Sequence, residues 1–277
     1  METGESISFI RTLNNWYWED LARFHSIRCA DQTAAVVNGA STLRHLELSA
    51  VGDPGGRQLL HLMCHLGHDS VSWARLGARV VAADASKSAL SAASKIAGRS
   101  GVNIEFERVL LPATPANWLS RFEFIVMTYG TIAWVSELDT WAESCFACLS
   151  AGGHLVVIDD HPLADCLRPL SDGKSLILDD KLFVHEAGGI RCHRTKGSYV
   201  DRSAKIATPV HYRWHHSISD LINALTRAGL KISKQLEYPF THYDRFPSFV
   251  LRSDGYFEPP KVPPCPLMFS VVAKKPA

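Results

Sequence analysis

Short apolar runs alternate with amphipathic stretches through the middle of the chain. The runs are rich in Val, Ile and Leu and are bounded by turn residues, which is typical of buried strands. The amphipathic stretches repeat their apolar positions at helical spacing, and the last of them stops at Gly152 and Gly153. The predicted strands are residues 58–63, 79–84, 103–109, 122–130 and 154–160, and the predicted helices between them are 68–78, 86–101 and 136–153. This order predicts an α/β fold, with a parallel sheet covered by helices on both faces.

One more helix and two more strands are predicted toward the C-terminal end. Residues 217–232 carry an amphipathic pattern that begins at Ser217, and Asp220 stands at the spacing of a capping box. The strand candidates are residues 231–238 and 267–275. The proline-rich segment "EPPKVPPCP" lies between them and predicts a stiff loop.

Two regions do not follow the alternation. Residues 1–54 have a helical pattern, and their Trp16, Tyr17 and Trp18 either cover a ligand or pack into the core. Residues 161–214 show no clear helix but contain alternating pieces such as "SLILDDKLFVHE" and "VHYRWHH". We therefore expect a helical lid over residues 1–54, a core made of residues 55–160 and 215–277, and a β-rich insertion over residues 161–214 that caps a binding pocket.

The composition is that of an ordinary globular protein, with 46% hydrophobic and 21% charged residues among 277. The formal net charge is +1 and no block of Lys and Arg is present, which argues against nucleic acid as a partner. The first residues carry two glutamates and no long apolar run, so we expect neither a signal peptide nor a membrane anchor. Seven scattered cysteines predict reduced thiols in a cytoplasmic protein, and Cys145 and Cys148 lack the second pair of a metal site.

The turn after the first predicted strand has the position of a cofactor site but lacks the usual glycines. A dinucleotide requires G-x-G-x-x-G there, because its pyrophosphate packs against bare backbone, whereas residues 64–69 read "CHLGHD". Asp84 ends the second strand, where an acid accepts hydrogen bonds from ribose hydroxyls. Asp69 repels phosphate but suits an ammonium group. A nucleoside with an amino-acid tail and no phosphate, such as S-adenosylmethionine, fits these residues.

Several motifs in one order carry a resemblance to a known family. They are "LHLMCHLGHDS" (60–70), "LGARVVAADAS" (76–86), "YGTIAWVSELDTWAESCFACLSAGGHLVVIDDHP" (129–162), "HHSISDLINALTRAGLKI" (215–232) and "PLMFSVVAKKP" (266–276), with Trp18 and His25 before them. The chain resembles the class I, or seven-stranded, S-adenosylmethionine-dependent methyltransferases, and among them a bacterial small-molecule subgroup. The resemblance implies a Rossmann-like sheet of seven strands whose last strand is antiparallel.

The resemblance also implies which residues bind S-adenosylmethionine and its product S-adenosylhomocysteine. Asp84 would hold the ribose, and Asp69 would help to anchor the methionine part. Leu110 stands where the family usually has an acid for the adenine amino group, so this sequence departs from the pattern there. The full implied set is Trp18, His25, Met63, Cys64, His65, Gly67, Asp69, Asp84, Ala85, Ser86, Leu110, Leu111, Thr128, Tyr129 and Gly130.

Three residues are candidates for catalysis. His161 directly follows the fifth strand and is either a general base or a structural histidine beside Pro162. Tyr129 either positions the acceptor or packs on the cofactor. His216 opens the late helix and either points into the site or caps the helix.

A metal site is not expected. His61, Cys64, His65 and His68 imitate a ligand cluster, but His61 lies within a strand and the others lie in the cofactor turn. Four ligands of one ion would destroy that turn.

These observations predict a methyltransferase that acts on N, O, S or C of a small molecule, and the resemblance implies a place in secondary metabolism. Two rivals remain: a non-catalytic S-adenosylmethionine-binding protein, and an NAD-dependent oxidoreductase with a degenerate turn. A nucleic-acid methyltransferase is disfavoured, because "TYGT" follows the fourth strand in place of N/D-P-P-Y/W. We expect a monomer or a homodimer, without a nucleic-acid or membrane partner.

Overall fold

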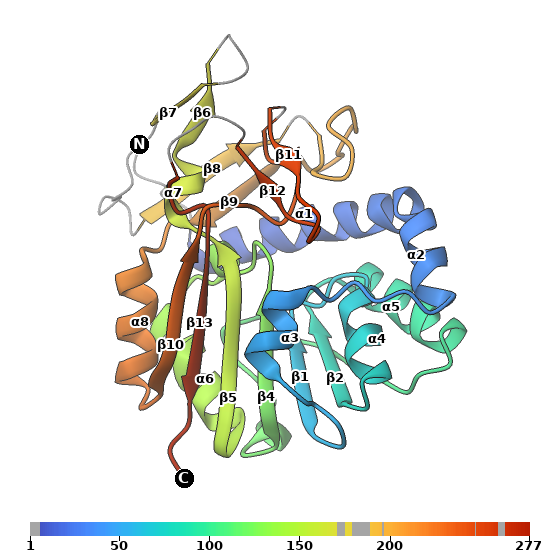
Figure 1. Ribbon diagram of the computed structural model, residues 1–277, viewed down its shortest axis with the longest axis vertical. Helices are drawn as coiled ribbons and strands as arrows, with labels where there is room; N and C mark the ends of the chain where they lie inside the picture. Colours follow the sequence, from blue (N-terminus) through green and yellow to red (C-terminus); the bar gives the residue numbers. More distant parts are fainter. Residues whose placement is uncertain (1–5, 171–174, 179–188, 196, 247, 260–263) are drawn as a thin grey trace.

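The computed structural model describes residues 6–170, 175–178, 189–195, 197–246, 248–259 and 264–277. Its centre is a seven-stranded sheet in the order β10-β13-β5-β4-β1-β2-β3 (Figure 1). The strands are β1 (Gln58–Leu62), β2 (Arg79–Asp84), β3 (Glu105–Arg108), β4 (Phe122–Thr128), β5 (Leu149–Asp160), β10 (Lys231–Tyr238) and β13 (Met268–Lys274). The first five are parallel, and β13 runs antiparallel between β5 and β10. The predicted seven-stranded α/β fold with an antiparallel last strand is confirmed.

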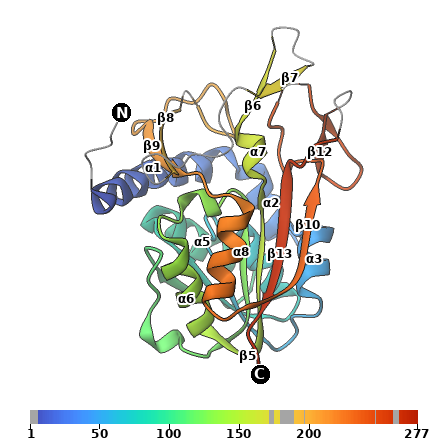
Figure 2. The same cartoon turned by 90° about the vertical axis from the view of Figure 1, so that its left-hand side faces the viewer.

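Helices cover both faces of the sheet because successive strand residues point to opposite sides. In β5, Leu155 and Val157 pack in one core cluster, and Val156 and Ile158 pack in the other. Figure 2 shows α6 and α8 on the first face and α3 on the second. The helices of the two faces are α3 (His45–Val51), α4 (His68–Arg75), α5 (Lys87–Arg99), α6 (Leu138–Cys148) and α8 (Ile218–Arg227), with short 3₁₀ turns η1 (Ala116–Trp118) and η2 (Ile132–Trp134).

The remaining elements gather beyond the carboxyl ends of the parallel strands (Figure 1). They are α1 (Ile7–Arg28), α2 (Ala30–Val37), α7 (Pro162–Asp165), and the strand pairs β6 (Leu167–Pro169) with β7 (Leu176–Leu178), β8 (Ile190–Arg194) with β9 (Val210–Trp214), and β11 (Val250–Leu251) with β12 (Phe257–Glu258). Among the described residues, none of the helices combines the length and the apolar content needed to cross a bilayer.

A buried amide fixes α1 to the insertion. The side chain of Asn14 donates to the carbonyl oxygen of Tyr212 and accepts from its N–H, both at 2.8 Å. Asn14 is only 7% exposed, so its side chain satisfies both backbone groups of Tyr212 through buried hydrogen bonds. The first helix and β9 are thereby held together although 198 positions separate them.

The helix predicted over residues 136–153 is wrong in its last five residues. It ends at Cys148, and Leu149 already belongs to β5. Gly152 and Gly153 lie at a register shift between β4 and β5, where a Cβ on Gly153 would stand 2.9 Å from two carbonyl oxygens. The two glycines therefore mark a β-bulge and not a helix stop.

The insertion after β5 is β-rich as expected, but it also contains the short helix α7, which the prediction missed. The expected strand piece at residues 175–186 begins as β7, and its part beyond 178 lies outside the described residues. Four residues of the proline-rich segment, 260–263, also lie outside them. The predicted capping box is present, because Ser217 and Asp220 exchange their side-chain and backbone hydrogen bonds at the start of α8.

Gly67 allows α4 to begin close to α5. Its φ is +73°, and a Cβ at this position would lie 2.8 Å from the Cβ of Ala93. Only glycine meets both conditions without strain. This glycine is therefore required by the packing of two helices, in addition to its place in the turn after β1.

We expect Gly67→Ala to lower the free energy of unfolding by about 3 kcal/mol, from backbone strain together with overpacking. Gly101→Ala is the matched control, since Gly101 has φ +67° and its Cβ would meet nothing within 4 Å. That control should lose only about 1 kcal/mol. Urea unfolding measures both values, and equal losses would contradict the proposed contact with Ala93.

Candidate active site

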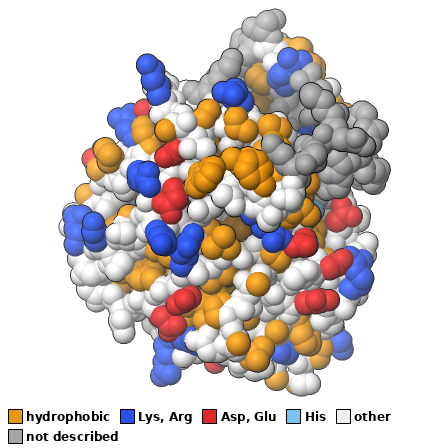
Figure 3. Space-filling view, turned by 180° about the vertical axis from the view of Figure 1, so that it is seen from behind, with side chains coloured by type: hydrophobic (Ala, Val, Ile, Leu, Met, Phe, Trp, Pro, Cys, Tyr) orange, Lys and Arg blue, Asp and Glu red, His pale blue; other side chains and the backbone are white. Residues whose placement is uncertain are grey.

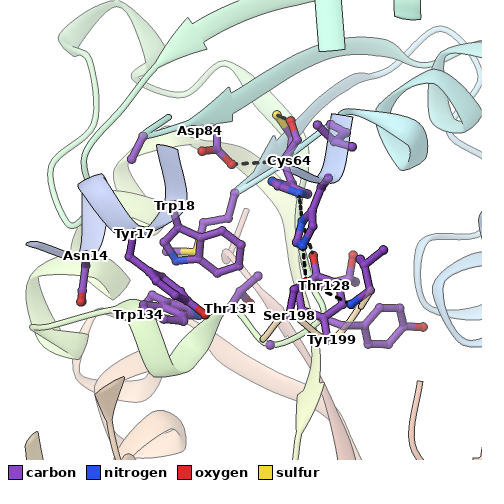
Figure 4. Close-up of a pocket in the computed structure, with 18 of the residues that line it drawn as sticks. Asn14, Tyr17, Trp18, Cys64, Asp84, Thr128, Thr131, Trp134, Ser198 and Tyr199 are labelled. Carbon is purple, nitrogen blue, oxygen red and sulfur yellow. Dashed lines mark hydrogen bonds between the residues drawn. The ribbon is translucent and has the colours of Figure 1, made fainter. Parts of the chain in front are cut away.

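A cavity of about 880 Å³ opens beyond the carboxyl ends of β1, β2 and β4 (Figure 4). This is where open parallel sheets hold their ligands. One wall is the turn after β1 with the ends of β2 and β4, and the other walls come from α1, β8, β9 and the segment after β10. Its volume lies within the usual range for small-molecule sites of about 300–1,000 Å³.

The turn after β1 has the backbone conformation of a glycine-rich turn but contains only one glycine, Gly67. Met63, His65 and Gly67 have φ values of +54°, +49° and +73°, although two of them carry side chains. The N–H groups of Cys64, His65 and Gly67 donate to acceptors within the protein at 2.9–3.0 Å. Those three donors are therefore not offered to a phosphate, unlike the donors of an anion-binding turn.

Asp84 joins this turn to the next one. Its carboxylate accepts the N–H of His65 through Oδ2 and the N–H of Ser86 through Oδ1, each at 2.9 Å. Burial raises the pKa of Asp84, while the two N–H groups act in the opposite direction. Each oxygen keeps a further lone pair, so the carboxylate at the cavity wall can also accept from hydroxyls of a ligand.

A second acid lies at the start of α4. Asp69 lines the cavity and accepts a hydrogen bond from the hydroxyl of Thr42. Cys64 lies beside it in the turn, and burial raises the pKa of its thiol well above the ordinary value. Because only the thiolate is a strong nucleophile, Cys64 is suited to line the cavity and not to attack a substrate.

Two histidines connect the turn to α1. His65 Nε2 lies 2.8 Å from His25 Nδ1, and His25 Nε2 lies 2.5 Å from the hydroxyl of Ser198. Burial lowers the pKa of His25 to about 4 and that of His65 to about 3. Both rings are neutral at pH 7, so one donates and the other accepts.

Aromatic rings form the wall under α1. Tyr17 stacks on His211 at 4.2 Å and on Trp134 at 5.8 Å between ring centroids. Trp18 meets Trp134 edge-on at 5.1 Å and meets His65 edge-on at 5.6 Å. This aromatic wall faces the cavity between the cofactor turn and the insertion, so it offers flat apolar surface to a ligand.

Asp159 fixes the loop after β4. Its carboxylate accepts the N–H groups of Gly130, Thr131 and Ile132 at 2.7–2.8 Å, and the hydroxyl of Thr131 at 2.8 Å. With its acceptor sites filled by the protein, Asp159 is a structural acid. It holds the end of β4 in the shape that closes the floor of the cavity.

Comparison with known proteins gives a consistent result. Residues 59–153 match the family model of a methyltransferase domain. The S-adenosylmethionine-dependent methyltransferase from Mesorhizobium loti is similar over 86% of this chain and 100% of its own, with 19% identity and a TM-score of 0.57. The putative S-adenosylmethionine-dependent methyltransferase from Listeria monocytogenes is similar over 84% of this chain and 97% of its own, with 16% identity and a TM-score of 0.55. The [4+2]-cyclase SpnF is similar over 94% of this chain and 97% of its own, with 14% identity and a TM-score of 0.55. A search among curated proteins found no match.

The chain has the class I methyltransferase fold. S-adenosylmethionine is the cofactor that this fold and the matched domain imply. The residues present fit it, because the N–H groups of residues 64, 65 and 67 are not free to cradle a phosphate, whereas Asp84 and Asp69 present carboxylate acceptors to the cavity.

Most of the predicted cofactor residues of this methyltransferase fold line the cavity together. They are Trp18, His25, Met63, Cys64, His65, Gly67, Asp69, Asp84, Ala85, Leu110, Leu111, Thr128, Tyr129 and Gly130. Leu110 presents an apolar side chain to the cavity where the family usually has an acid, as expected from the sequence.

Three predicted residues do not line this cavity. Ser86 is buried, and its hydroxyl accepts the N–H of Ala89 to cap α5. His161 accepts a backbone N–H of α7 through Nδ1, and its Nε2 lies 3.4 Å from Glu237. His216 donates from Nε2 to a backbone carbonyl at 2.7 Å. Each side chain is occupied in holding backbone or a surface pair, and neither His161 nor His216 lines this cavity.

Other lining residues were missed because they come from the insertion and the tail. Ser198, Tyr199, His211 and Arg213 belong to the insertion, and His242 follows β10. No local spacing marks them, since only the tertiary fold brings them to the cavity. Within the described residues, no group of three or more His, Cys, Asp or Glu side chains is placed to hold a metal ion.

The histidine pair should make stability depend on pH. The unfolded chain protonates histidine near pH 6.5, whereas the folded chain keeps His25 and His65 neutral to about pH 4. Their contribution is complete above pH 6.5 and is lost as the pH falls toward 4. We expect His65→Asn to lose about 2 kcal/mol less than the wild type between pH 7 and pH 5 in urea unfolding. Parallel losses in the two proteins would show that the pair is not neutral in the fold.

Proposed function

We propose that this protein transfers a methyl group from S-adenosylmethionine to a small molecule bound in the same cavity. The observation that carries the proposal is the continuity of this cavity. It runs from the acids Asp84 and Asp69 at the cofactor turn to the aromatic wall of Tyr17, Trp18 and Trp134. A cofactor held at one end leaves its reactive group facing a ligand held at the other.

The sheet order supports a division of the cavity into two halves. Asp84 ends β2 and the cofactor turn follows β1, so the cofactor lies over these two strands. β4 and β5 continue the sheet on the other side of β1, below the insertion and the segment after β10. The acceptor then lies over β4 and β5.

The residues of the chain position and shield the reactants. When bound, S-adenosylmethionine supplies a methyl group on a positively charged sulfur. Asp84 accepts the ribose hydroxyls and Asp69 accepts the ammonium group. Trp18 covers the turn from α1, and the His25–His65 pair keeps α1 in place over it. Alignment and exclusion of water are the main contributions that this reaction asks of a protein.

Two rival functions remain distinguishable by experiment. A non-catalytic S-adenosylmethionine-binding protein would have the same cofactor residues, and the similar SpnF is described as a cyclase, so the fold alone does not establish methyl transfer. An NAD-dependent oxidoreductase is disfavoured by the turn, whose N–H groups at residues 64, 65 and 67 already have partners.

The domain division is part of the proposal. Residues 1–54 serve as the lid, although α3 packs with the sheet through Leu46 and Val51. Residues 55–160 and 215–277 form the core, and residues 161–214 cap the acceptor.

We further propose a cytoplasmic enzyme of a bacterial small-molecule subgroup, serving secondary metabolism as a monomer or homodimer. Figure 3 shows basic and acidic side chains interspersed on the face behind the sheet, which does not suit a nucleic-acid backbone.

Calorimetric titration tests the cofactor site. We expect the wild type to bind S-adenosylmethionine and S-adenosylhomocysteine but not NADH. Asp84→Ala should weaken both adenosyl ligands at least tenfold, about 1.4 kcal/mol, because it removes the ribose acceptor and unties two turns. Asp139→Ala is the matched control, since Asp139 is an exposed acid paired with Arg227 on the helix layer. Failure of both adenosyl ligands to bind the wild type would overturn the proposal.

Turnover separates the enzyme from a binding protein. S-adenosylmethionine with a labelled methyl group is incubated with panels of phenol, amine and thiol acceptors, and labelled product is measured. Label in any acceptor that requires Asp84 supports the enzyme. Tight cofactor binding without transfer to any panel favours the binding protein.

A further inference from the structure

We propose that His242, oriented by Asp160, is the general base of the reaction, and that the acceptor is a planar aromatic molecule with an ionisable hydroxyl. This inference rests on the proposed function and extends it to the acceptor half of the cavity. His242 has no readable spacing from other groups in the sequence, so it is the structure that brings it to notice.

His242 is held at the cavity wall by contacts on both sides. Its ring stacks on Tyr129 with 4.5 Å between centroids and 10° between planes. Its backbone carbonyl accepts from Arg44 at 2.9 Å. Nε2 lies 3.6 Å from Asp160 Oδ1. The ring is therefore fixed in plane and in direction, which a base in a preorganised site requires.

The two ring nitrogens have different surroundings. Nε2 is buried and has no hydrogen-bond partner among the described residues, so the nearby Asp160 carboxylate is its natural acceptor. Nδ1 is not buried, and no described residue bonds to it. With the proton on Nε2, the lone pair of Nδ1 is available to a molecule in the cavity. Such contacts commonly tighten only when substrate binds.

Asp160 belongs to a chain of charges that cancels. Arg245 bonds to Asp160 at 3.1 Å and also to Asp165, and Arg213 lies 2.9 Å from Asp165. Burial raises the pKa of Asp160, but Arg245 and His242 lower it by more. The pKa is therefore below its ordinary value, and Asp160 stays ionised. Two acids face two arginines, so neither Asp160 nor Asp165 is left as a spare carboxylate for a cationic amine.

The two tyrosines that contact the His242 ring keep their own protons. Tyr129 turns its hydroxyl to Tyr256 at 3.0 Å, and burial raises the pKa of Tyr129 far above its ordinary value. Tyr243 accepts from Arg245 at 3.1 Å, and burial raises its pKa to about 12. Both phenols therefore stay neutral, and the guanidinium of Arg44 lies over the ring of Tyr129, 5.8 Å from its centroid.

The aromatic wall and the base together select the acceptor class. Tyr17, Trp134 and His211 line the cavity as aromatic rings packed against one another, and such a rigid apolar wall suits a flat ring better than an aliphatic chain. A phenol has a pKa of about 10 and an imidazole about 6.5, so a histidine can take that proton as the bond forms. An aliphatic alcohol is far too weak an acid for this base.

The step balances without a further reactant. The phenol oxygen forms the new bond to the methyl carbon, and the carbon–sulfur bond breaks with its electron pair left on sulfur. The phenol proton goes to Nδ1 of His242, and the imidazolium is stabilised by Asp160 until it loses a proton to water. The products are an aryl methyl ether and S-adenosylhomocysteine.

Two ionisable dyes test the proposal without turnover. 4-Nitrophenol and the fused-ring phenol 4-methylumbelliferone are titrated into protein saturated with S-adenosylhomocysteine, and the phenolate is followed by absorbance over a pH series. In the wild type, we expect at least one dye to ionise about one pH unit or more below its value in water, because His242 takes the proton.

The variants separate the base from its surroundings. His242→Phe keeps a ring on Tyr129 without the nitrogens, so the dye should still bind but ionise as it does in water. Asp160→Asn should give an intermediate shift, since the positioning residue is changed and the base is kept. His154→Asn alters a histidine at the opposite end of the β5–β13 pairing and should match the wild type.

Calorimetry with S-adenosylhomocysteine on each variant distinguishes the two proposals. If the wild type does not bind S-adenosylhomocysteine, the proposed function fails. If it binds, but neither dye binds or His242→Phe shows the wild-type shift, only the assignment of base and acceptor is overturned.

Discussion

The carboxylate of Asp84 is the contact on which the cavity depends. It accepts one N–H from the turn after β1 and one from the turn after β2, and so fixes the two turns to each other. In the part of the chain described, no other side chain accepts backbone N–H groups from both turns. Without it, the left-handed backbone at Met63 and His65 would lose a partner that offsets its strain. A single acid therefore shapes the turn and also offers acceptors to a ligand.

The sequence predicted the parts of the molecule that depend on local patterns. Residues 79–84 form a strand with the predicted bounds. A short apolar run with β-branched residues is typical of a buried strand, and the helix before it has a different period of apolar positions. Asp84 was found for the same reason, since its position at a strand end is visible in one segment. The error at Gly152 and Gly153 arose because a glycine pair marks a bulge as readily as a helix end, and only the register with β4 decides between them.

The acceptor half escaped prediction for a physical reason. Asp160, Asp165 and Arg213 come from β5, α7 and β9, and Arg245 comes from the segment after β10. Their side chains are only 10–23% exposed, which is tolerated because the opposite charges neutralise one another. Charged residues of this kind look like surface residues in a sequence, since lone buried charges are costly. His161 attracted notice by following a strand, whereas His242 lies in an irregular segment and gains its place only through Tyr129 and Asp160.

The bond between Asn14 and Tyr212 has a consequence for protein engineering. Both backbone groups of Tyr212 are satisfied by a side chain of the first helix, 198 positions away. A chimera that took its insertion from one relative and its first helix from another would lose these two buried hydrogen bonds, unless both parent proteins kept the pairing. The two segments are a single exchangeable unit in space, and new acceptor specificity is best sought by transplanting them together.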